Sequence, residues 1–501
     1  MICAVLYAES FLLLDQQLQA ALNQGSEIIE IRLDAISNLN VEHLSNLIKK
    51  YNDTDIILTL RSEWKSTEID PPIEGRQSLL KKIINLKPKF LDLEFPLDMH
   101  LISSLPSETT PVITALDFEG MAKIALDPLL DLVLKINKKL IVKIAATPNT
   151  VNDLRQIWRW AKILKKNKLD YVVLGMGQLG QITRVKYKEL GNVWTYGRFD
   201  KKEGEPFLPG MLFIEELMKS NPISSYHLAN IGDISENDAL RTIYSELFKV
   251  SKIDGIFMNL PIQTSPELDQ MMLWFEDGLL DGINITKPWQ VDILDKISIK
   301  DSSADIMGAA NCITYTKDGL KAYNTQIEGL KRSLEPFSLK RIKRVYIDGT
   351  ERIAKAVVEV LKDKVETIVI RDELFSSGND LVDHYDTLMS SVDSYSDNYD
   401  LIVNCNKPVK GFENVVMLPR TILENAKLFF DPMSKLNIKS PLKKFAEKNS
   451  IRYIGGYQFF FNTALANFEL WTKRSIPNSS INSDLFDPFD DEIDFGFMLN
   501  Y

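Results

Sequence analysis

Short apolar runs rich in β-branched residues alternate with segments of helical periodicity through residues 1–222. We read eight of these runs as strands, at residues 2–8, 28–34, 56–61, 90–95, 111–118, 140–146, 171–176 and 193–198. Strands that are joined through helices form parallel sheets, because each helix returns the chain to the edge at which strands begin. Eight such units in a segment of this length predict a (β/α)8 TIM barrel, and hence an α/β protein.

The alternation restarts after Pro222, which predicts further domains beyond the barrel of residues 1–222. We expect a smaller α/β domain over residues 223–335, with a β-hairpin through NCITYTKDGLKAYN. A Rossmann-like domain is expected over residues 336–474, and its last helix, in GGYQFFFNTALANFELWTK, should pack back on the smaller domain. Residues 475–501 form an acidic tail with aromatic residues, for which a disordered segment and a short docking segment both remain open.

Composition and charge narrow the class of protein. A chain of 501 residues, 45% of them hydrophobic, is too long for one core, and its net charge of −10 is not gathered into basic patches. Neither nucleic acid nor membrane is therefore an expected partner. No uncharged apolar run has the length of a membrane span and the N-terminus does not resemble a signal peptide, so we expect a cytoplasmic location. Cys3, Cys312 and Cys405 are too dispersed to predict a disulfide framework or a metal site.

Charged residues interrupt the apolar strands near their carboxyl ends, where a (β/α)8 barrel carries its active site. These residues are Glu30, Arg32, Asp34, Arg61, Lys143 and Arg184. Guanidinium groups bind carboxylates through pairs of parallel hydrogen bonds. The set therefore predicts a site for an anionic, oxygen-rich small molecule.

Lys143 stands inside an otherwise apolar strand, between Val142 and Ile144. In one interpretation, burial and neighbouring cations disfavour its ammonium form, so that the amine attacks a ketone and forms a Schiff base. In the other, Lys143 pairs with Glu30 as an interior ion pair that has no catalytic role. The sequence pattern alone leaves both interpretations open.

The strand-end residues carry a resemblance to a family. The segments EIRLD, TLR and VKIA, the element M-G-x-x-G-x-x-T-R at residues 176–184 and the PG pair at 209–210 resemble type I 3-dehydroquinate dehydratase. The resemblance covers residues 1–222. It implies that Lys143 forms an imine with the substrate ketone, that Glu30 and Arg32 orient the site, and that no cofactor is required. It also implies that Arg61 and Arg184 hold the substrate.

Four positions depart from the pattern of that family. Leu116 stands where the family has its general-base histidine, and Lys65 stands near the place of a family glutamate. Phe207 and Met211 replace a hydroxyl and an amide of the closing loop. General acid–base catalysis contributes about 10²–10⁴-fold to a rate, so we expect slow dehydration or none.

Residues 223–474 resemble shikimate dehydrogenase, and the order of the two halves is similar to that of bifunctional dehydroquinate dehydratase–shikimate dehydrogenase proteins. The motifs are GINITKPW, GAANCIT and YNTQIEG. The resemblance implies a pocket for shikimate, a cyclohexene carboxylate, and NADP as the cofactor. The residues that it places in this pocket are Asn284, Thr286, Asn311, Asn324 and Thr325.

The second half also departs from its family. The catalytic lysine and aspartate fall on Gln290 and Gln326, which are neutral amides, and a substrate-contacting glutamine falls on the shorter Asn462. The loop that should hold a pyrophosphate, YIDGTERIAKA, has one glycine, Gly349, and only Arg371 remains of the basic element for the 2′-phosphate of NADP. We expect a retained fold that does not bind the dinucleotide.

These observations leave three hypotheses. In the first, the chain is a shikimate-pathway enzyme of aromatic amino acid biosynthesis that dehydrates 3-dehydroquinate through Lys143, beside a weak or inactive dehydrogenase half. In the second, it is a non-catalytic relative that binds a shikimate-like metabolite or a protein partner. In the third, it is a decaying copy with no selected activity. The residues at 116, 290 and 326 argue against full bifunctional catalysis, whereas the charged set around Lys143 favours surviving ligand binding.

Overall fold

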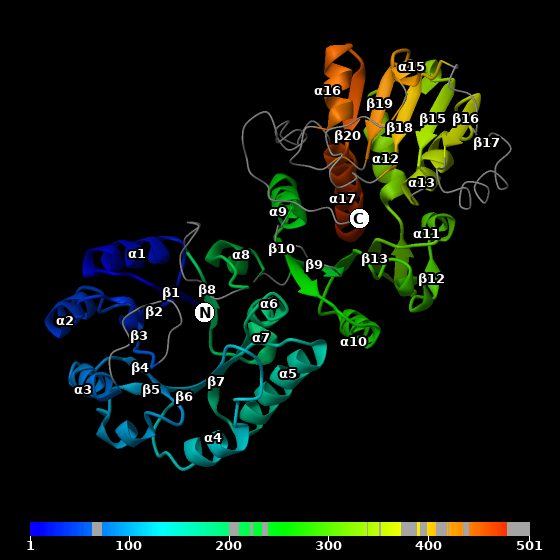
Figure 1. The fold of residues 1–501 in the computed structure, drawn as a ribbon. Helices are drawn as coiled ribbons and strands as arrows, with labels where there is room; N and C mark the ends of the chain where they lie inside the picture. The colour runs from blue at the N-terminus through cyan, green and yellow to red at the C-terminus, as the bar shows by residue number, and fades with distance from the viewer. Residues whose placement is uncertain are drawn as a thin grey trace. The chain divides into compact units, whose positions relative to one another are not determined.

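A computed structural model of the chain describes residues 1–62, 73–199, 210–220, 224–232, 239–337, 339–349, 352–371, 388–390, 398–406, 418, 420–432, 434 and 440–477. The structure divides into two compact units (Figure 1). One unit consists of Met1–Ser225 with Asp254–Met271, and the other of Tyr226–Ile253 with Met272–Tyr501.

In the first unit, eight parallel strands of the described chain form one sheet with the order β7-β6-β5-β4-β3-β2-β1-β8. The strands are β1 (Ile2–Leu6), β2 (Ile28–Arg32), β3 (Asp55–Thr59), β4 (Phe90–Glu94), β5 (Thr110–Asp117), β6 (Ile141–Ala146), β7 (Asp170–Gly175) and β8 (Thr195–Gly197). Between β7 and β8, the Asn192 side chain bonds the backbone N–H and carbonyl of Val173, each at 2.8 Å. The sheet is thus a nearly closed barrel, which confirms the fold predicted for this region.

Helices cover the outside of this barrel (Figure 1). They are α1 (Phe11–Asn23), α2 (Val41–Lys50), α3 (Ile73–Ile84), α4 (Leu126–Val133), α5 (Val151–Lys166), α6 (Gln181–Val185), α7 (Tyr187–Leu190) and α8 (Ile214–Lys219). In α5, the Thr150 hydroxyl accepts from the Asp153 N–H, and the Asp153 carboxylate accepts from the Thr150 N–H. This reciprocal cap satisfies backbone donors that the first helical turn leaves unpaired.

Register decides which side chains enter the barrel. Lys143 lies opposite Thr114 of β5 and Val172 of β7. Side chains two residues apart along a strand share one face, and Ile141 and Ala145, on either side of Lys143, belong to the apolar interior cluster. The two-residue alternation of side chains along the strand therefore places the ammonium group of Lys143 inside the barrel.

The second unit contains two sheets. In the first of them, β9 (Tyr226–Gly232), β11 (Gly282–Ile285), β13 (Cys312–Thr316), β14 (Gly319–Tyr323) and β12 (Ile299–Lys300) are neighbours in this order. β13 and β14 pair antiparallel, with Cys312 opposite Tyr323, so the predicted hairpin is confirmed. The short helices α9 (Ala239–Ser251) and α11 (Ser302–Met307) accompany this sheet. β10 (Gly255–Pro261) and most of α10 (Ser265–Glu276) lie in the segment that belongs to the first unit.

The other sheet has the order β17-β16-β15-β18-β19-β20, which in chain order is the 3-2-1-4-5-6 arrangement of a Rossmann fold. Its strands are β15 (Arg344–Asp348), β16 (Thr367–Arg371), β17 (Leu388–Ser390), β18 (Leu401–Asn404), β19 (Leu428–Asp431) and β20 (Arg452–Gly455). The helices are α12 (Gln326–Leu334), α13 (Arg352–Leu361), α15 (Arg420–Leu423), α16 (Pro441–Lys448) and α17 (Gly456–Thr472). The predicted Rossmann-like fold is confirmed.

The long helix α17 also contacts the hairpin sheet. The Trp471 indole N–H donates to the Ile313 carbonyl of β13 at 2.9 Å, and Asn467 bonds Tyr244 of α9 at 3.3 Å. Gly282 allows this approach, because a Cβ there would lie 2.3 Å from the Trp471 ring. Among the residues that the structure describes, no helix has the length and apolar character to cross a membrane.

Candidate functional site

Lys143 lies at the centre of the candidate site in the barrel, and its side chain is buried, with 6% of the residue exposed. Its Nζ donates to Glu30 Oε2 at 2.7 Å and approaches Asp92 Oδ2 at 3.5 Å. The ammonium also sits 4.4 Å from the centre of the Tyr196 ring, within the range of a cation–π contact. The expectation that cations surround Lys143 was wrong, because two carboxylates lie closest to it.

The two carboxylates beside Lys143 differ in their acidity. Burial opposes the ionisation of Glu30, but attraction to Lys143 and Arg61 outweighs it and lowers the pKa of Glu30 to about 2. For Asp92, burial is the largest influence and raises the pKa, in spite of the attraction of Arg61 and Lys143. Glu30 is therefore a fixed anion, whereas Asp92 is the carboxylate that binds a proton more readily.

Arg32 and Arg61 lie in the site, but both are engaged by carboxylates. Arg32 makes a two-pronged bond to Asp34 at 3.0 and 2.6 Å, and it donates to the Tyr7 hydroxyl at 3.0 Å. Arg61 bonds Asp92 at 3.0 Å and lies 3.4 Å from Glu94. Burial opposes the charge of Arg61, but these carboxylates outweigh it and raise the pKa of the guanidinium. Both arginines are thus positioned as part of a charge network.

Arg184 differs from the other two arginines. It is 1% exposed, and its Nη1 donates to the Tyr196 carbonyl at 3.3 Å. Its Nε and Nη2 have no hydrogen-bond partner among the residues that the structure describes. Burial lowers the pKa of Arg184 to about 10, although the nearby hydroxyls of Tyr196 and Tyr7 act in the opposite direction. A buried guanidinium with two unused donors is suited to an anionic ligand.

Close glycine packing holds Arg184 in place. A Cβ at Gly180 would lie 2.4 Å from the backbone of Gly175, and one at Gly210 would lie 2.0 Å from the Gly177 carbonyl. The Thr183 hydroxyl bonds both ends of the same turn, at 2.8 Å to the Gly175 N–H and 2.6 Å to the Gly180 carbonyl. The two glycine-containing motifs singled out in the sequence therefore meet next to α6, which carries Arg184.

The positions that depart from the family pattern are apolar in the structure where they are described. Leu116 is half-buried against the interior cluster, and Met211 is a buried member of it. Thr114, two residues before Leu116, points inward and donates to Asp92 at 2.7 Å, so Leu116 shares the face on which a proton-transfer group would be needed. Lys65 and Phe207 lie outside the described residues.

Sequence reasoning missed three side chains of this site: Asp92, Glu94 and Tyr196. The segment FLDLEF did carry a signal, because its two acids alternate with leucines and so must share one face of the strand. Glu94 bonds the backbone N–H of Ser62 at 2.9 Å and also accepts from the Ser62 hydroxyl. It thereby fixes the end of β3 next to Arg61.

In the second unit, three of the five residues predicted to line a substrate pocket join buried side-chain networks. Asn284 donates to Asn230 at 2.7 Å and accepts from Asn467 at 2.9 Å. Thr325 donates to Asn467 at 2.5 Å and accepts from Asn311 at 3.0 Å. The fourth residue, Asn324, donates to the Ala309 carbonyl at 3.0 Å, while Thr286, the fifth, donates to the Ile231 carbonyl at 3.1 Å. These side chains are uncharged, and their hydrogen bonds connect strand ends to helices.

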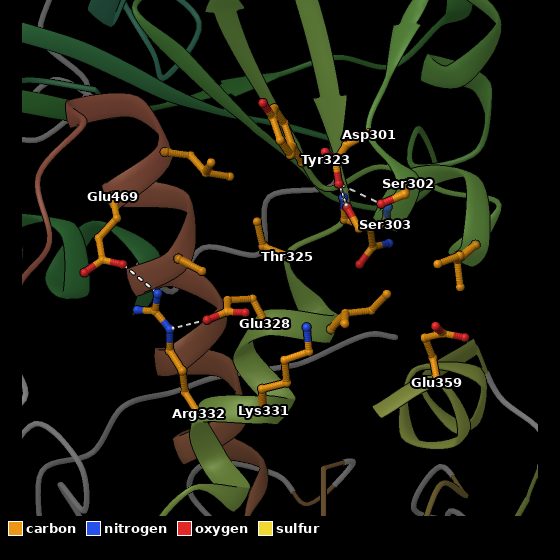
Figure 2. A pocket seen from close by; sticks show the side chains of 15 residues that line it. Asp301, Ser302, Ser303, Tyr323, Thr325, Glu328, Lys331, Arg332, Glu359 and Glu469 are labelled. Atoms are coloured by element: carbon orange, nitrogen blue, oxygen red, sulfur yellow. Dashed lines mark hydrogen bonds and ion pairs between the residues drawn. The ribbon is translucent and has the colours of Figure 1, made fainter. Parts of the chain in front are cut away.

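A pocket of about 480 Å³ lies beside this network, between α11, α12, α13 and α17 (Figure 2). Asn324 and Thr325 line it, whereas Asn284, Thr286 and Asn311 do not. Arg332 is paired there with Glu328 at 3.1 Å and Glu469 at 2.6 Å, as the dashed lines in Figure 2 show. Two of the five predicted residues therefore line this pocket, and one of them, Thr325, also belongs to the buried network.

Gln290 and Asn462, which stand at positions that the resemblance assigns to catalysis and to substrate contact, are each bonded to a neighbouring group. Gln290 donates to the Ile285 carbonyl at 3.1 Å, and Asn462 donates to the Ser333 hydroxyl at 3.0 Å. The backbone N–H of Gln326 donates to Asn324 at 3.1 Å and begins α12. Neither Gln290 nor Gln326 can supply or accept a full proton near neutral pH, since a carboxamide does not ionise there.

The carboxyl edge of the Rossmann-like sheet, where a dinucleotide binds in this fold, carries an ion pair. Arg371, at the end of β16, donates to the buried carboxylate of Asp348, at the end of β15, at 2.5 Å. Gly349 follows with a φ of +96°, and a Cβ there would lie 2.5 Å from the Asn406 side chain. Among the described residues, this edge places the buried Asp348 carboxylate, paired with Arg371, where a phosphate would approach, and a carboxylate repels a phosphate.

Both halves of the chain are similar to known proteins. Residues 2–223 match the family model described as type I 3-dehydroquinase. The whole chain is similar to the bifunctional 3-dehydroquinate dehydratase/shikimate dehydrogenase of Arabidopsis thaliana chloroplasts, with 23% identity over 95% of this chain and 83% of that protein. It is also similar to the shikimate biosynthesis protein AroDE of Chlamydia pneumoniae, with 24% identity over 96% of this chain and 98% of that protein.

Among solved structures, the dehydroquinate dehydratase and shikimate dehydrogenase of S. pombe AroM covers 97% of this chain and 98% of its own, with 16% identity and a TM-score of 0.46. The family match and the two curated relatives together define the chain as a shikimate-pathway fusion of a dehydroquinase and a shikimate dehydrogenase region. The resemblance stated from the motifs is confirmed.

Proposed function

We propose that the barrel binds 3-dehydroquinate through an imine on Lys143 and dehydrates it slowly. One observation carries this proposal: Lys143 and Arg184 both contact the same residue, Tyr196. Lys143 lies 4.4 Å from the Tyr196 ring centre, and Arg184 lies 3.3 Å from the Tyr196 carbonyl. An amine for a ketone and two unused guanidinium donors for a carboxylate are the two groups that a keto acid of this size requires.

The slow rate follows from what surrounds the imine. Dehydration removes a proton from the carbon next to the imine and expels a hydroxyl group, so both a base and an acid must act. Leu116 supplies neither, and the nearest ionisable groups, Glu30 and Asp92, are bonded to Lys143 and Arg61. We expect turnover about 10²–10⁴-fold below that of an enzyme with a positioned histidine.

We assign no hydride transfer to the second half. The amides Gln290 and Gln326 replace the proton-transferring pair, and the Asp348–Arg371 ion pair occupies the edge at which NADP would place its phosphates. Shikimate dehydrogenases that use NADP occur among the relatives, such as that of Nitrosopumilus maritimus, which is 24% identical over 52% of this chain. The described residues of this chain do not fit that cofactor.

A second candidate function is a non-catalytic protein that binds a shikimate-like carboxylate. The packing of Leu116 and Met211 against the interior cluster favours it, because it removes polar groups from the region where proton transfer would occur. Both candidates retain Lys143 and Arg184 as ligand-binding groups, and they differ only in turnover.

One experiment tests the proposal and separates the two candidates. The protein is incubated with 3-dehydroquinate and borohydride, which reduces an imine to a stable amine, and the modified residue is located by mass spectrometry. The expected result is an adduct on Lys143 together with slow formation of the conjugated dehydroshikimate product, followed by its ultraviolet absorbance. An adduct without product supports the non-catalytic candidate, and a protein that forms no adduct contradicts the Schiff-base proposal.

A further inference from the structure

Asp92 was not among the site residues predicted from the sequence, and it has no assigned role in the proposed imine chemistry. It lies on β4, and it is 2% exposed. Its Oδ2 accepts from Arg61 at 3.0 Å and from Thr114 at 2.7 Å, and it lies 3.5 Å from Lys143 Nζ. The three contacts all fall on one oxygen, Oδ2, which is therefore the oxygen that faces the ammonium group of Lys143.

We propose that Asp92 is the proton acceptor and donor for Lys143 during formation of the imine. The inference rests on the proposed function, since it concerns a step of the same reaction. Asp92 contacts the reacting nitrogen atom itself, and it belongs to a different strand from both Glu30 and Lys143.

The alternative acceptor is Glu30, which lies closer to the ammonium, at 2.7 Å. Lys143 and Arg61 overcome the effect of burial and lower the pKa of Glu30 to about 2, so it holds a proton poorly. Burial raises the pKa of Asp92, so that carboxylate gains a proton at less cost. Glu30 then remains charged and holds the nitrogen in place while Asp92 exchanges the proton.

Lys143, Asp92 and the substrate ketone account for every proton that moves in this step. The Lys143 ammonium gives one of its three protons to Asp92, and the resulting amine forms a C–N bond to the ketone carbon while the carbonyl pair moves to oxygen. A second proton passes from nitrogen to that oxygen and gives the carbinolamine. Asp92 returns its proton to the hydroxyl, the C–O bond breaks, and water leaves as the nitrogen pair forms the iminium. One proton stays on nitrogen, two leave in water, and Asp92 is again a carboxylate.

The test is the rate at which the borohydride-trapped adduct on Lys143 forms with 3-dehydroquinate, followed in single-turnover time courses. We expect Asp92→Asn to slow adduct formation about 10²-fold, because general acid–base catalysis is lost. The slow variant should also regain rate as the concentration of an acetate or imidazole buffer rises, whereas the wild-type rate should not depend on the buffer. A purely structural role of Asp92 would not produce this buffer dependence.

A matched control is Asp98→Asn. Asp98 is also a buried carboxylate with a two-pronged arginine partner, Arg76, at 2.7 and 2.8 Å, but it does not touch Lys143. Its adduct rate should stay within about threefold of wild type. Asp92→Glu keeps the charge opposite Arg61 while it moves the oxygens, and it serves if Asp92→Asn does not fold; its adduct rate should also fall.

The outcomes separate this inference from the proposed function. A wild-type protein that forms no adduct defeats the proposed function itself. A wild-type protein that forms the adduct, with folded Asp92→Asn and Asp92→Glu variants that form it equally fast, defeats the role of Asp92 alone. Slow adduct formation in the Asp92 variants without any response to buffer assigns Asp92 to holding Arg61 and likewise contradicts the proposal.

Discussion

The barrel site and the strand ends of the second unit use polar groups in opposite ways. In the barrel, Lys143 is held between Glu30 and Asp92, and every one of these groups is buried and charged or titratable. In the second unit, the corresponding network runs through Asn284, Asn467 and neighbouring amides, which carry no charge. A charged network retains the capacity for proton transfer, whereas an amide network retains shape and hydrogen bonding only. The barrel network thus contains groups able to transfer protons, whereas the amide network of the second unit does not.

The largest effect should come from removing the amine. Lys143→Met keeps an apolar stem of similar length but no nucleophile, and we expect complete loss of the borohydride adduct with 3-dehydroquinate. The variant leaves Glu30 and Asp92 without their common partner, so thermal unfolding should be measured in parallel. An adduct that persists at another lysine would break the contrast between the two halves, because the barrel chemistry would then not depend on this network.

The next effect concerns Leu116, which stands where the resemblance to the family places a proton-transfer group. Leu116→His places an imidazole on the same inward face as Thr114, and we expect product formation to rise about 10²-fold with little change in the amount of adduct. Steady-state turnover measured by product absorbance checks this. Leu116→Gln, similar in size but unable to ionise, is the control; an equal gain in that variant would show that polarity rather than proton transfer was limiting.

A smaller effect is expected for ligand affinity. Arg184→Gln removes the guanidinium with two unused donors, and we expect the dissociation constant for 3-dehydroquinate, or for a non-reacting carboxylate analogue, to rise about 10–100-fold. Titration calorimetry measures the change. The matched comparison is Arg198→Gln, which removes an arginine that stacks 4.0 Å from the Phe213 ring in the same barrel. Equal losses in both variants would contradict a specific role for Arg184.

Restoring the ionisable residues in the second half should not give the protein dehydrogenase activity. Gln290→Lys combined with Gln326→Asp restores the ionisable pair but leaves the Asp348–Arg371 edge unchanged, so we expect no NADP-dependent oxidation of shikimate. Fluorescence titration with NADPH should show no saturable binding in this variant or in wild type. Tight binding to the wild-type protein would overturn the assignment of this edge as unfit for phosphate.

The smallest effect concerns stability and pH. The folded-state pKa of Glu30 is lowered from an ordinary value of 4.5 to about 2. A depressed carboxyl pKa stabilises the fold above the ordinary value, and this stabilisation is lost as the pH falls from about 4.5 through about 2. Denaturant midpoints over that range should fall more steeply for wild type than for Lys143→Met, which lacks the charge that depresses the pKa. Identical pH profiles would show that the ion pair contributes nothing measurable.

The alternation of apolar strands with helices was enough to predict the strands of the barrel, the hairpin and the Rossmann-like series, because it leaves few topologies. The sequence also predicted an interior position for Lys143 and left pairing with Glu30 as one of two interpretations; the structure shows that pair at 2.7 Å. That the side chains at residues 116, 290 and 326 do not ionise near neutral pH is readable without coordinates.

Which charges meet depends on the tertiary structure. The sequence could not show that Asp92 reaches Lys143, since that contact joins β4 to β6 across β5, nor that Arg61 is engaged by acids while Arg184 keeps two donors unused. It likewise could not pair Arg371 with Asp348, or show that Asn324 and Thr325 line a pocket while Asn284, Thr286 and Asn311 do not. Charge effects act through space over a few ångströms, and only the closed fold brings residues that are distant in sequence to that separation.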